Sequence, residues 1–240
     1  MIPFRRLVPM CCVVALAVSG CGSDSADKRN AKAATASGTP SVSASATPSA
    51  DQTAAVALVF KTYKAAVLAK DGPAAVDVVA NTTYEFYDQA RVSALDASKQ
   101  ELAALAPAKR MTALVMRGSL QADVLRSSTP KQLLVAAVDA GLIGEDGVKS
   151  LEIGQVQVSG ESATAAAKVR GAATDFDLAF VRQDGQWKFD LLPLLDVGTR
   201  GFETAAKQQG MTVNEFIDAA LEQQYGQEKF AQIVSRPLGR

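Results

Sequence analysis

The 240-residue sequence offers a narrow choice of side chains for chemistry, because it contains no histidine. Histidine is the usual proton carrier at neutral pH and the commonest metal ligand in proteins. Its absence excludes serine and cysteine nucleophiles that depend on a histidine base. The groups that remain are carboxylates, phenols, lysines and hydroxyls, and we expect neither a metal site nor a bound cofactor.

One spacing typical of a nucleophile occurs at Ser128-Thr129-Pro130-Lys131. Serine acyl enzymes place a lysine three residues after the serine, where it can deprotonate the hydroxyl, but they also carry Ser-Asp-Asn and Lys-Thr-Gly motifs that this sequence lacks. We therefore interpret Ser128 or Thr129 as the cap of a helix that starts at Pro130. Three glycines are interpreted as turn residues, because no Lys-Ser/Thr of a phosphate-binding loop follows them: Gly141, Gly144 and Gly147.

Cysteine chemistry is indicated near the start of the chain. Arg5 and Arg6 precede an apolar run over residues 7–18, which is the layout of a signal peptide. The run ends in Val18-Ser19-Gly20-Cys21, which resembles the lipobox of bacterial lipoproteins. The resemblance implies cleavage after residue 20 and a diacylglyceryl group on the Cys21 thiol. We expect residues 1–20 to be the signal and Cys21 the lipid anchor; the alternative is an ordinary secretory signal with an incidental cysteine.

Residues 21–51 are expected to form a disordered tether, because they are rich in Ser, Ala, Thr and Pro and nearly free of large apolar side chains. Three basic residues near the anchor, Lys28, Arg29 and Lys32, add little to the attraction of the acyl chains for the membrane. The apolar run is shorter than the roughly 20 residues that cross a bilayer, so we expect no membrane-spanning helix after processing. Cys11 and Cys12 leave with the signal, which predicts a domain without a disulfide.

Residues 52–240 have the length of one ordinary domain, and its α+β part, residues 52–193, begins with helical patterns. A first amphipathic helix is predicted to run to about Asp71-Gly72, and Pro73, Pro107 and Pro130 suit helix starts. Capping boxes are predicted at Thr82–Glu85 and Ser98–Glu101, and a C-terminal glycine cap at Gly141. The charge after removal of the signal is slightly acidic, without a basic stripe, so we do not expect a nucleic-acid partner.

An antiparallel meander is predicted from Leu151 onward, where the apolar period changes from 3.6 to 2. Gly154 marks an expected bulge. Asp184-Gly185 is a strong hairpin signal and predicts the pairs Phe180–Phe189, Leu178–Leu191 and Arg182–Trp187. A second turn at Gly171-Ala172 predicts the pairs Ala167–Phe176, Ala165–Leu178 and Ala163–Phe180. Residues 194–240 return to a helical period, with a capping box at Thr212–Glu215, and are expected to cover the sheet or one of its edges.

Helices followed by such a meander resemble the nuclear transport factor 2-like family, a cone-shaped α+β fold shared with ketosteroid isomerases. The resemblance rests on residues 84–88 in an early helix and on residues 176–192 in the last hairpin, and it covers about 52–193. It implies an aspartate base facing a tyrosine donor inside the cone. The available residues are Tyr84, Tyr87, Asp88, Asp175, Asp177 and Asp190. The strand pattern turns the last three to the outer face with Lys188, which leaves the helical set.

We expect a lipoprotein at the cell envelope, facing the periplasm or the exterior, that presents a non-catalytic binding or scaffolding domain. The competing hypothesis is a cofactor-free isomerase or lyase that uses Asp88 with Tyr84 or Tyr87 on a small apolar ligand. Expected partners are the membrane, through lipid on Cys21, an envelope protein or apolar small molecule, and a second copy in a homodimer through the outer sheet face.

Overall fold

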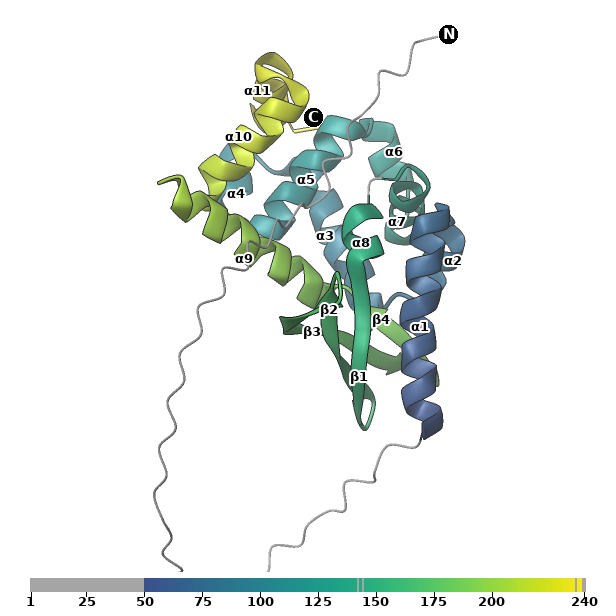
Figure 1. The fold of residues 1–240 in the computed structure, drawn as a ribbon. Helices are drawn as coiled ribbons and strands as arrows, with labels where there is room; N and C mark the ends of the chain where they lie inside the picture. Colours follow the sequence, from purple (N-terminus) through teal and green to yellow (C-terminus); the bar gives the residue numbers. More distant parts are fainter. Residues whose placement is uncertain (1–49, 142, 144, 236, 239–240) are drawn as a thin grey trace, which may run out of the picture. The chain divides into compact units, whose positions relative to one another are not determined.

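The computed structural model describes residues 50–141, 143, 145–235 and 237–238. Within this part of the chain, eight helices come first, a four-stranded antiparallel sheet follows, and three helices close the chain (Figure 1). The predicted α+β class and the order of helices before strands are confirmed. The signal, Cys21 and nearly all of the tether lie outside the described residues.

The first eight helices are α1 (Ala50–Ala69), α2 (Gly72–Asp77), α3 (Asn81–Asp96), α4 (Lys99–Ala104), α5 (Pro107–Ser119), α6 (Ala122–Ser127), α7 (Pro130–Asp139) and α8 (Glu145–Ser150). The strands are β1 (Leu151–Ser159), β2 (Ser162–Val169), β3 (Ala172–Gln183) and β4 (Gln186–Asp190). The last helices are α9 (Leu192–Gln208), α10 (Val213–Tyr225) and α11 (Gln227–Ser235). Helix α1 thus includes two residues assigned to the tether, and α9 begins before residue 194.

Most of the predicted helix starts are confirmed. Complete capping boxes occur at Ser98–Glu101 and Thr212–Glu215, as predicted, and a third joins Thr129 to Gln132. Thr129 is therefore the cap of α7, and Pro130 occupies its first turn. Each box satisfies backbone N–H groups that a helix start leaves unbonded.

The capping box predicted at Thr82–Glu85 is wrong. Helix α3 starts at Asn81 after Ala80, and no side chain caps it. The fully buried Thr83 hydroxyl accepts a hydrogen bond from the Leu191 N–H at 3.3 Å. The Thr82 hydroxyl donates to the Asp190 carboxylate at 3.0 Å. The two hydroxyls therefore join α3 to the end of β4, a contact between residues 108 positions apart that local spacing does not reveal.

The four strands form a meander in the order β1-β2-β3-β4. The last hairpin pairs Phe180 with Phe189 and Arg182 with Trp187, as predicted. Its turn residues Asp184 and Gly185 both have positive φ, 51° and 76°, as a two-residue hairpin turn of type I′ requires. The predicted bulge is confirmed as a register shift between Ile153 and Val156. Leu191 lies beyond the end of β4, so the predicted Leu178–Leu191 pair is not part of the ladder.

The hairpin turn predicted at Gly171-Ala172 is wrong by one residue. The turn residues are Arg170 and Gly171, with φ of 53° and 79°, and Val169 pairs with Ala172. A register shift between Ala166 and Lys168 then restores the predicted pairs Ala165–Leu178 and Ala163–Phe180. Ala167 does not pair with Phe176; its carbonyl accepts a hydrogen bond from the Thr174 hydroxyl at 2.9 Å. Because of this register shift, the strands bury the predicted face although the turn lies one residue earlier than predicted.

A first apolar core fills the space between α1 and the inner face of the sheet. Phe189 lies at its centre, stacked on Phe180 with ring centroids 5.1 Å apart. Phe60 and Tyr63 of α1 meet the Phe189 ring edge-on at 5.7 and 5.1 Å. The small residues Ala163, Ala165 and Ala167 complete the layer below these rings, as large and small side chains interdigitate. The protein's own side chains therefore fill the space between α1 and the inner face of the sheet.

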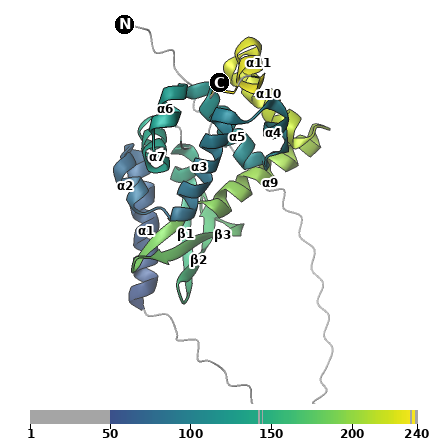
Figure 2. The ribbon, with the colours of Figure 1, turned by 180° about the vertical axis from the view of Figure 1, so that it is seen from behind.

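A second core lies among the helices and includes residues of α10 and α11 from the C-terminal extension. Leu102, Leu114 and Leu125 pack there with Ile217 and Leu221 of α10. Helix α9 contacts β3, whereas α10 packs on α9, α11 and α5, and α11 packs on α10, α5 and α4. The expectation that the whole tail covers the sheet is therefore wrong. Figure 2 shows α9 passing beside α3 and α5, which together form the pocket described below.

Candidate functional site

The helical members of the predicted acid and phenol set, Tyr84, Tyr87 and Asp88, lie on α3 in three different environments. The Tyr84 hydroxyl donates a hydrogen bond to the Val76 carbonyl. Burial, with the nearby negative charge of Asp77 as a second cause, raises the pKa of Tyr84 to about 12. Tyr84 is thus a neutral donor at physiological pH, and its proton is already bonded to the backbone of α2.

Tyr87 and Asp88 have other contacts. Tyr87 packs against both apolar cores and meets the Phe86 ring edge-on at 5.7 Å. The Asp88 carboxylate, 43% exposed, accepts hydrogen bonds from Arg91 Nε at 2.9 Å and Nη2 at 2.7 Å. The structure therefore gives Asp88 and Tyr84 separate partners and does not join them in a base–donor pair.

The three strand aspartates also differ in surroundings. Asp175 and Asp177 are exposed on the outer sheet face, as the alternation predicted. Asp190 is half-buried and accepts hydrogen bonds from the Thr82 hydroxyl and from the Leu192 N–H at 3.1 Å. Its carboxylate fixes the junction between β4, α3 and α9, which gives it a positioning role.

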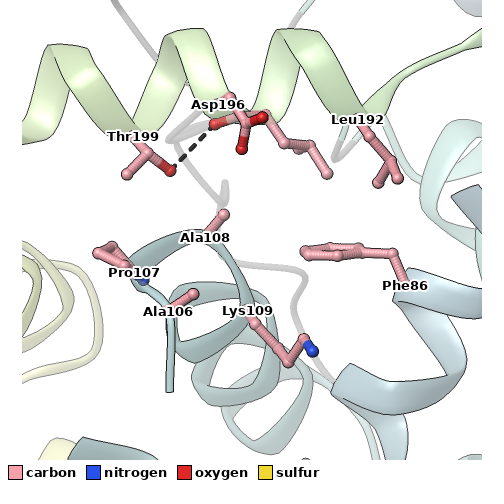
Figure 3. Close-up of a pocket in the computed structure, with 9 residues that line it drawn as sticks. Phe86, Ala106, Pro107, Ala108, Lys109, Leu192, Asp196 and Thr199 are labelled. Atoms are coloured by element: carbon pink, nitrogen blue, oxygen red, sulfur yellow. Dashed lines mark hydrogen bonds between the residues drawn. The ribbon is translucent and has the colours of Figure 1, made fainter. Parts of the chain in front are cut away.

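Two pockets bear on the site, and the larger of them lies between α3, α5 and α9 with a volume of about 290 Å³ (Figure 3). Its walls are mainly apolar: Phe86, Ala106, Pro107, Ala108, Leu192 and Leu195. Lys109, Asp196 and Thr199 add polar groups, and the Thr199 hydroxyl donates to the Leu195 carbonyl at 3.0 Å. Lys109 Nζ donates to the Gln89 side chain at 2.6 Å. The composition suits a small apolar group, and neither Tyr87 nor Asp88 lines it.

The smaller pocket, about 180 Å³, is polar and includes Tyr84. It lies where α2, α3 and α7 meet the β3–β4 turn. Lys131 Nζ pairs with the Asp77 carboxylate at 2.8 Å, and Lys188 Nζ donates to the Asp77 carbonyl at 2.6 Å. The hydrogen bond from Lys131 is the main cause that holds the pKa of Asp77 below its usual value. Lys131, weighed as a serine activator, instead binds a carboxylate on another helix.

Neither pocket could be predicted from the sequence, because the walls of each come from distant segments. Phe86 and Leu192 are separated by more than a hundred residues, and no spacing rule links Lys131 with Asp77 or Lys188. The only signal for the larger pocket was the tail, since α9 supplies one whole wall.

No three cysteine or acidic side chains in the described ranges are grouped so that they could hold a metal ion. None of the helices from α1 to α11 is both long and apolar enough to cross a bilayer. In comparisons with known proteins, no family model, curated protein or solved structure matches this chain.

Proposed function

We propose that this chain is a membrane-anchored bacterial lipoprotein that presents a non-catalytic binding or scaffolding domain at the cell envelope. The observation that carries the proposal is Val18-Ser19-Gly20-Cys21 at the end of a charged and then apolar leader. A Ser/Ala/Thr/Pro segment follows and reaches almost to Ala50, the first residue of α1. This order of signal, acylation site, tether and folded domain is what surface attachment requires.

A nuclear transport factor 2-like arrangement is part of the same proposal. It is supported by the long first helix, which contacts both outer strands of the meander, β1 and β4. The aromatic layer between α1 and the sheet also supports it. The helices α9–α11 extend this arrangement, and α10 and α11 share a second core with α5.

Binding of a protein is favoured over binding of a small molecule inside the sheet. Phe60, Tyr63, Phe180 and Phe189 fill that interior, and both described pockets open elsewhere on the domain. Catalysis by Asp88 with Tyr84 is disfavoured because each polar group already has a structural partner. An envelope protein is therefore the partner we propose, with the larger pocket as a seat for one of its apolar side chains.

The anchor is tested by labelling cells with an alkyne-bearing fatty acid and comparing the full chain with Cys21→Ala and Cys12→Ala. Cys12 is a matched control because it lies in the apolar run and is removed with the signal. We expect label on the parent and on Cys12→Ala but none on Cys21→Ala. A parent chain without label, or a labelled Cys21→Ala chain, would refute the anchor.

The binding role is tested by native mass spectrometry of the full chain released from the membrane in detergent. We expect no bound small molecule beyond detergent and lipid. A stoichiometric apolar metabolite that survives purification would contradict protein binding as the main role.

A further inference from the structure

Strand β1 is an open edge of the sheet. The opposite edge, β4, is covered by the segment before α3: Phe189 N–H donates to the Val78 carbonyl at 2.7 Å, and Ala80 N–H donates to the Phe189 carbonyl at 2.9 Å. Figure 1 shows β1 along its length, with β2 beside it and α1 on the inner side of the sheet. An uncovered edge is a template for pairing with another strand.

The backbone groups that face outward on β1 follow from the register. Ser159 pairs with Ser162 across a two-residue turn, and Gln157 pairs with Thr164, so these residues bond to β2. The Arg182 N–H bond to the Glu161 carbonyl fixes the same alternation from the other side of β2. The N–H and C=O groups of Val156 and Val158 therefore point away from the sheet. In the described part of the chain they have no hydrogen-bond partner.

The first part of β1 is protected, which limits the open edge to residues 154–159. Lys64 Nζ of α1 donates to the carbonyls of Lys149 and Leu151 at 2.8 and 2.7 Å. The bulge between Ile153 and Val156 then changes the strand's twist. Residues 154–159 include no charged residue and no proline. Proteins commonly place such residues on an edge strand to prevent pairing.

The side chains of the open segment suit pairing with an identical strand. Val156 and Val158 are half-buried and contact the first core, whereas Gln155, Gln157 and Ser159 are exposed on the outer face. A two-fold axis at Gln157 sets each Val156 opposite a Val158 on the core side. On the outer side it sets Gln157 opposite Gln157 and Gln155 opposite Ser159. No like charges meet, and the glutamine amides can bond to each other.

We infer that two copies of this chain pair antiparallel through β1 and join their sheets into one of eight strands. Val156 of each copy exchanges two backbone hydrogen bonds with Val158 of the other, which satisfies four N–H and four C=O groups at the edge. This interface differs from a dimer through the outer sheet face, because that face stays exposed. It does not depend on lipid at Cys21, although anchoring would raise the local concentration of copies.

A second copy is favoured over an unrelated extended peptide because the segment is self-complementary. An asymmetric peptide would gain the same backbone bonds, but nothing in a row of valines, glutamines and a serine selects its sequence. With an identical strand, the register is set by valine against valine and glutamine against glutamine.

Cysteine cross-linking of the full chain tests the register. At the two-fold axis Gln157 forms a non-hydrogen-bonded pair with about 4.5 Å between Cα atoms, which a disulfide can span. Gln155 is the matched control on the same strand and face; its two copies lie about 13 Å apart along the strands. We expect Gln157→Cys to give a covalent dimer under mild oxidation. For Gln155→Cys we expect no more covalent dimer than for the parent, which carries the native cysteines.

A second test of the register changes the charge of the strand and introduces no new thiol. Gln157→Lys sets two lysines directly opposite each other, whereas Gln155→Lys sets each lysine opposite a serine. We expect the dimer fraction, measured by mass photometry of the full chain, to fall at least tenfold for Gln157→Lys and less than threefold for Gln155→Lys, with unchanged circular dichroism for both. A monomeric parent chain, equal cross-linking of the two cysteine variants, or a Gln157→Cys adduct with a different protein would overturn the inference.

Discussion

The Arg110 guanidinium lies 2.6 Å from the Asp218 carboxylate and joins α5 to α10. Its Nη1 also donates to the Asn214 carbonyl at 3.3 Å, while Nε is buried without a partner in the described part of the chain. The Arg110 side chain is 4% exposed and the Asp218 side chain 37%. A buried cation thus holds the C-terminal extension, and the one carboxylate that pairs with it among the described residues is partly exposed.

Removal of the carboxylate should therefore harm the protein more than removal of the cation. We expect Asp218→Ala to lower the free energy of unfolding by about 2–3 kcal/mol, because it leaves a buried charge unpaired. Arg110→Met keeps most of the volume and removes the charge, so its cost should be under about 1.5 kcal/mol. Urea unfolding measures both. Asp123→Ala breaks an exposed ion pair with Arg126 and is the control, at under about 0.5 kcal/mol. An Asp218→Ala effect as small as the control would contradict this.

Arg117, one heptad later on α5, binds the ends of two other helices. Its Nε donates to the Ala94 carbonyl at 2.6 Å and its Nη2 to the Ser93 carbonyl at 3.1 Å and to the Ala97 carbonyl, all at the end of α3. Nη1 donates to the Ile233 carbonyl of α11 at 3.2 Å. Burial lowers the pKa of Arg117, but the carbonyl dipoles at the helix ends favour its charged form.

We expect Arg117→Met to destabilise the protein by about 3 kcal/mol or more, since several buried carbonyls lose their donor. Arg117→Lys should recover only part of this, because one ammonium nitrogen cannot reach both helix ends. Hydrogen exchange should locate the loss, with faster exchange of α11 amides than of α1 amides in the lysine variant. Equal protection of α11 in the parent and the lysine variant would show that the two-helix contact is unimportant.

The hydrogen bond between Tyr84 and Val76 predicts a pH dependence of stability. The pKa of Tyr84 is raised to about 12 in the folded state against 10 for a free tyrosine. The unfolded chain therefore ionises first, and the stabilisation by neutral Tyr84 is complete below pH 10 and declines as the pH rises toward 12. At pH 8 we expect Tyr84→Phe to be less stable by about 1 kcal/mol, for the lost hydrogen bond.

The difference between the parent and Tyr84→Phe should narrow between pH 10 and 12. Urea unfolding at pH 8, 10 and 11.5 measures it. Burial also raises the pKa of Tyr225, but that residue is present in both proteins and its effect cancels in the difference. A difference that is constant across the whole range would contradict the raised pKa.

The features that sequence predicted well depend on chemistry within a few residues. The capping box at Thr212–Glu215, the turn at Asp184-Gly185 and the bulge at Gly154 each require only local spacing. Long-range contacts of polar residues were not predictable in this way. Charged side chains are usually exposed, so nothing marked Arg110 or Arg117 as buried, and their partners lie up to 116 residues away.

For the candidate site, the strand alternation correctly predicted that Asp175 and Asp177 lie on the outer face. The sequence did not reveal the partners of the α3 residues. Asp88 bonds to Arg91 within its own helix, whereas Tyr84 bonds to another helix. The misplaced capping box has the same origin: the spacing Thr82–Glu85 is correct for a cap, but tertiary contacts use both threonines.

Thr82 and Thr83 therefore offer a direct test of local against tertiary roles. Thr83→Val removes the acceptor of the buried Leu191 N–H and should cost about 1–2 kcal/mol, because that donor loses its partner without access to water. Thr82→Val removes a hydrogen bond to the half-buried Asp190, which keeps the Leu192 N–H, and should cost under about 1 kcal/mol. Urea unfolding of the two isosteric variants measures the difference. If Thr82 capped α3, the order would reverse, because loss of a helix cap costs about 1 kcal/mol and the Thr83 change would then be nearly neutral.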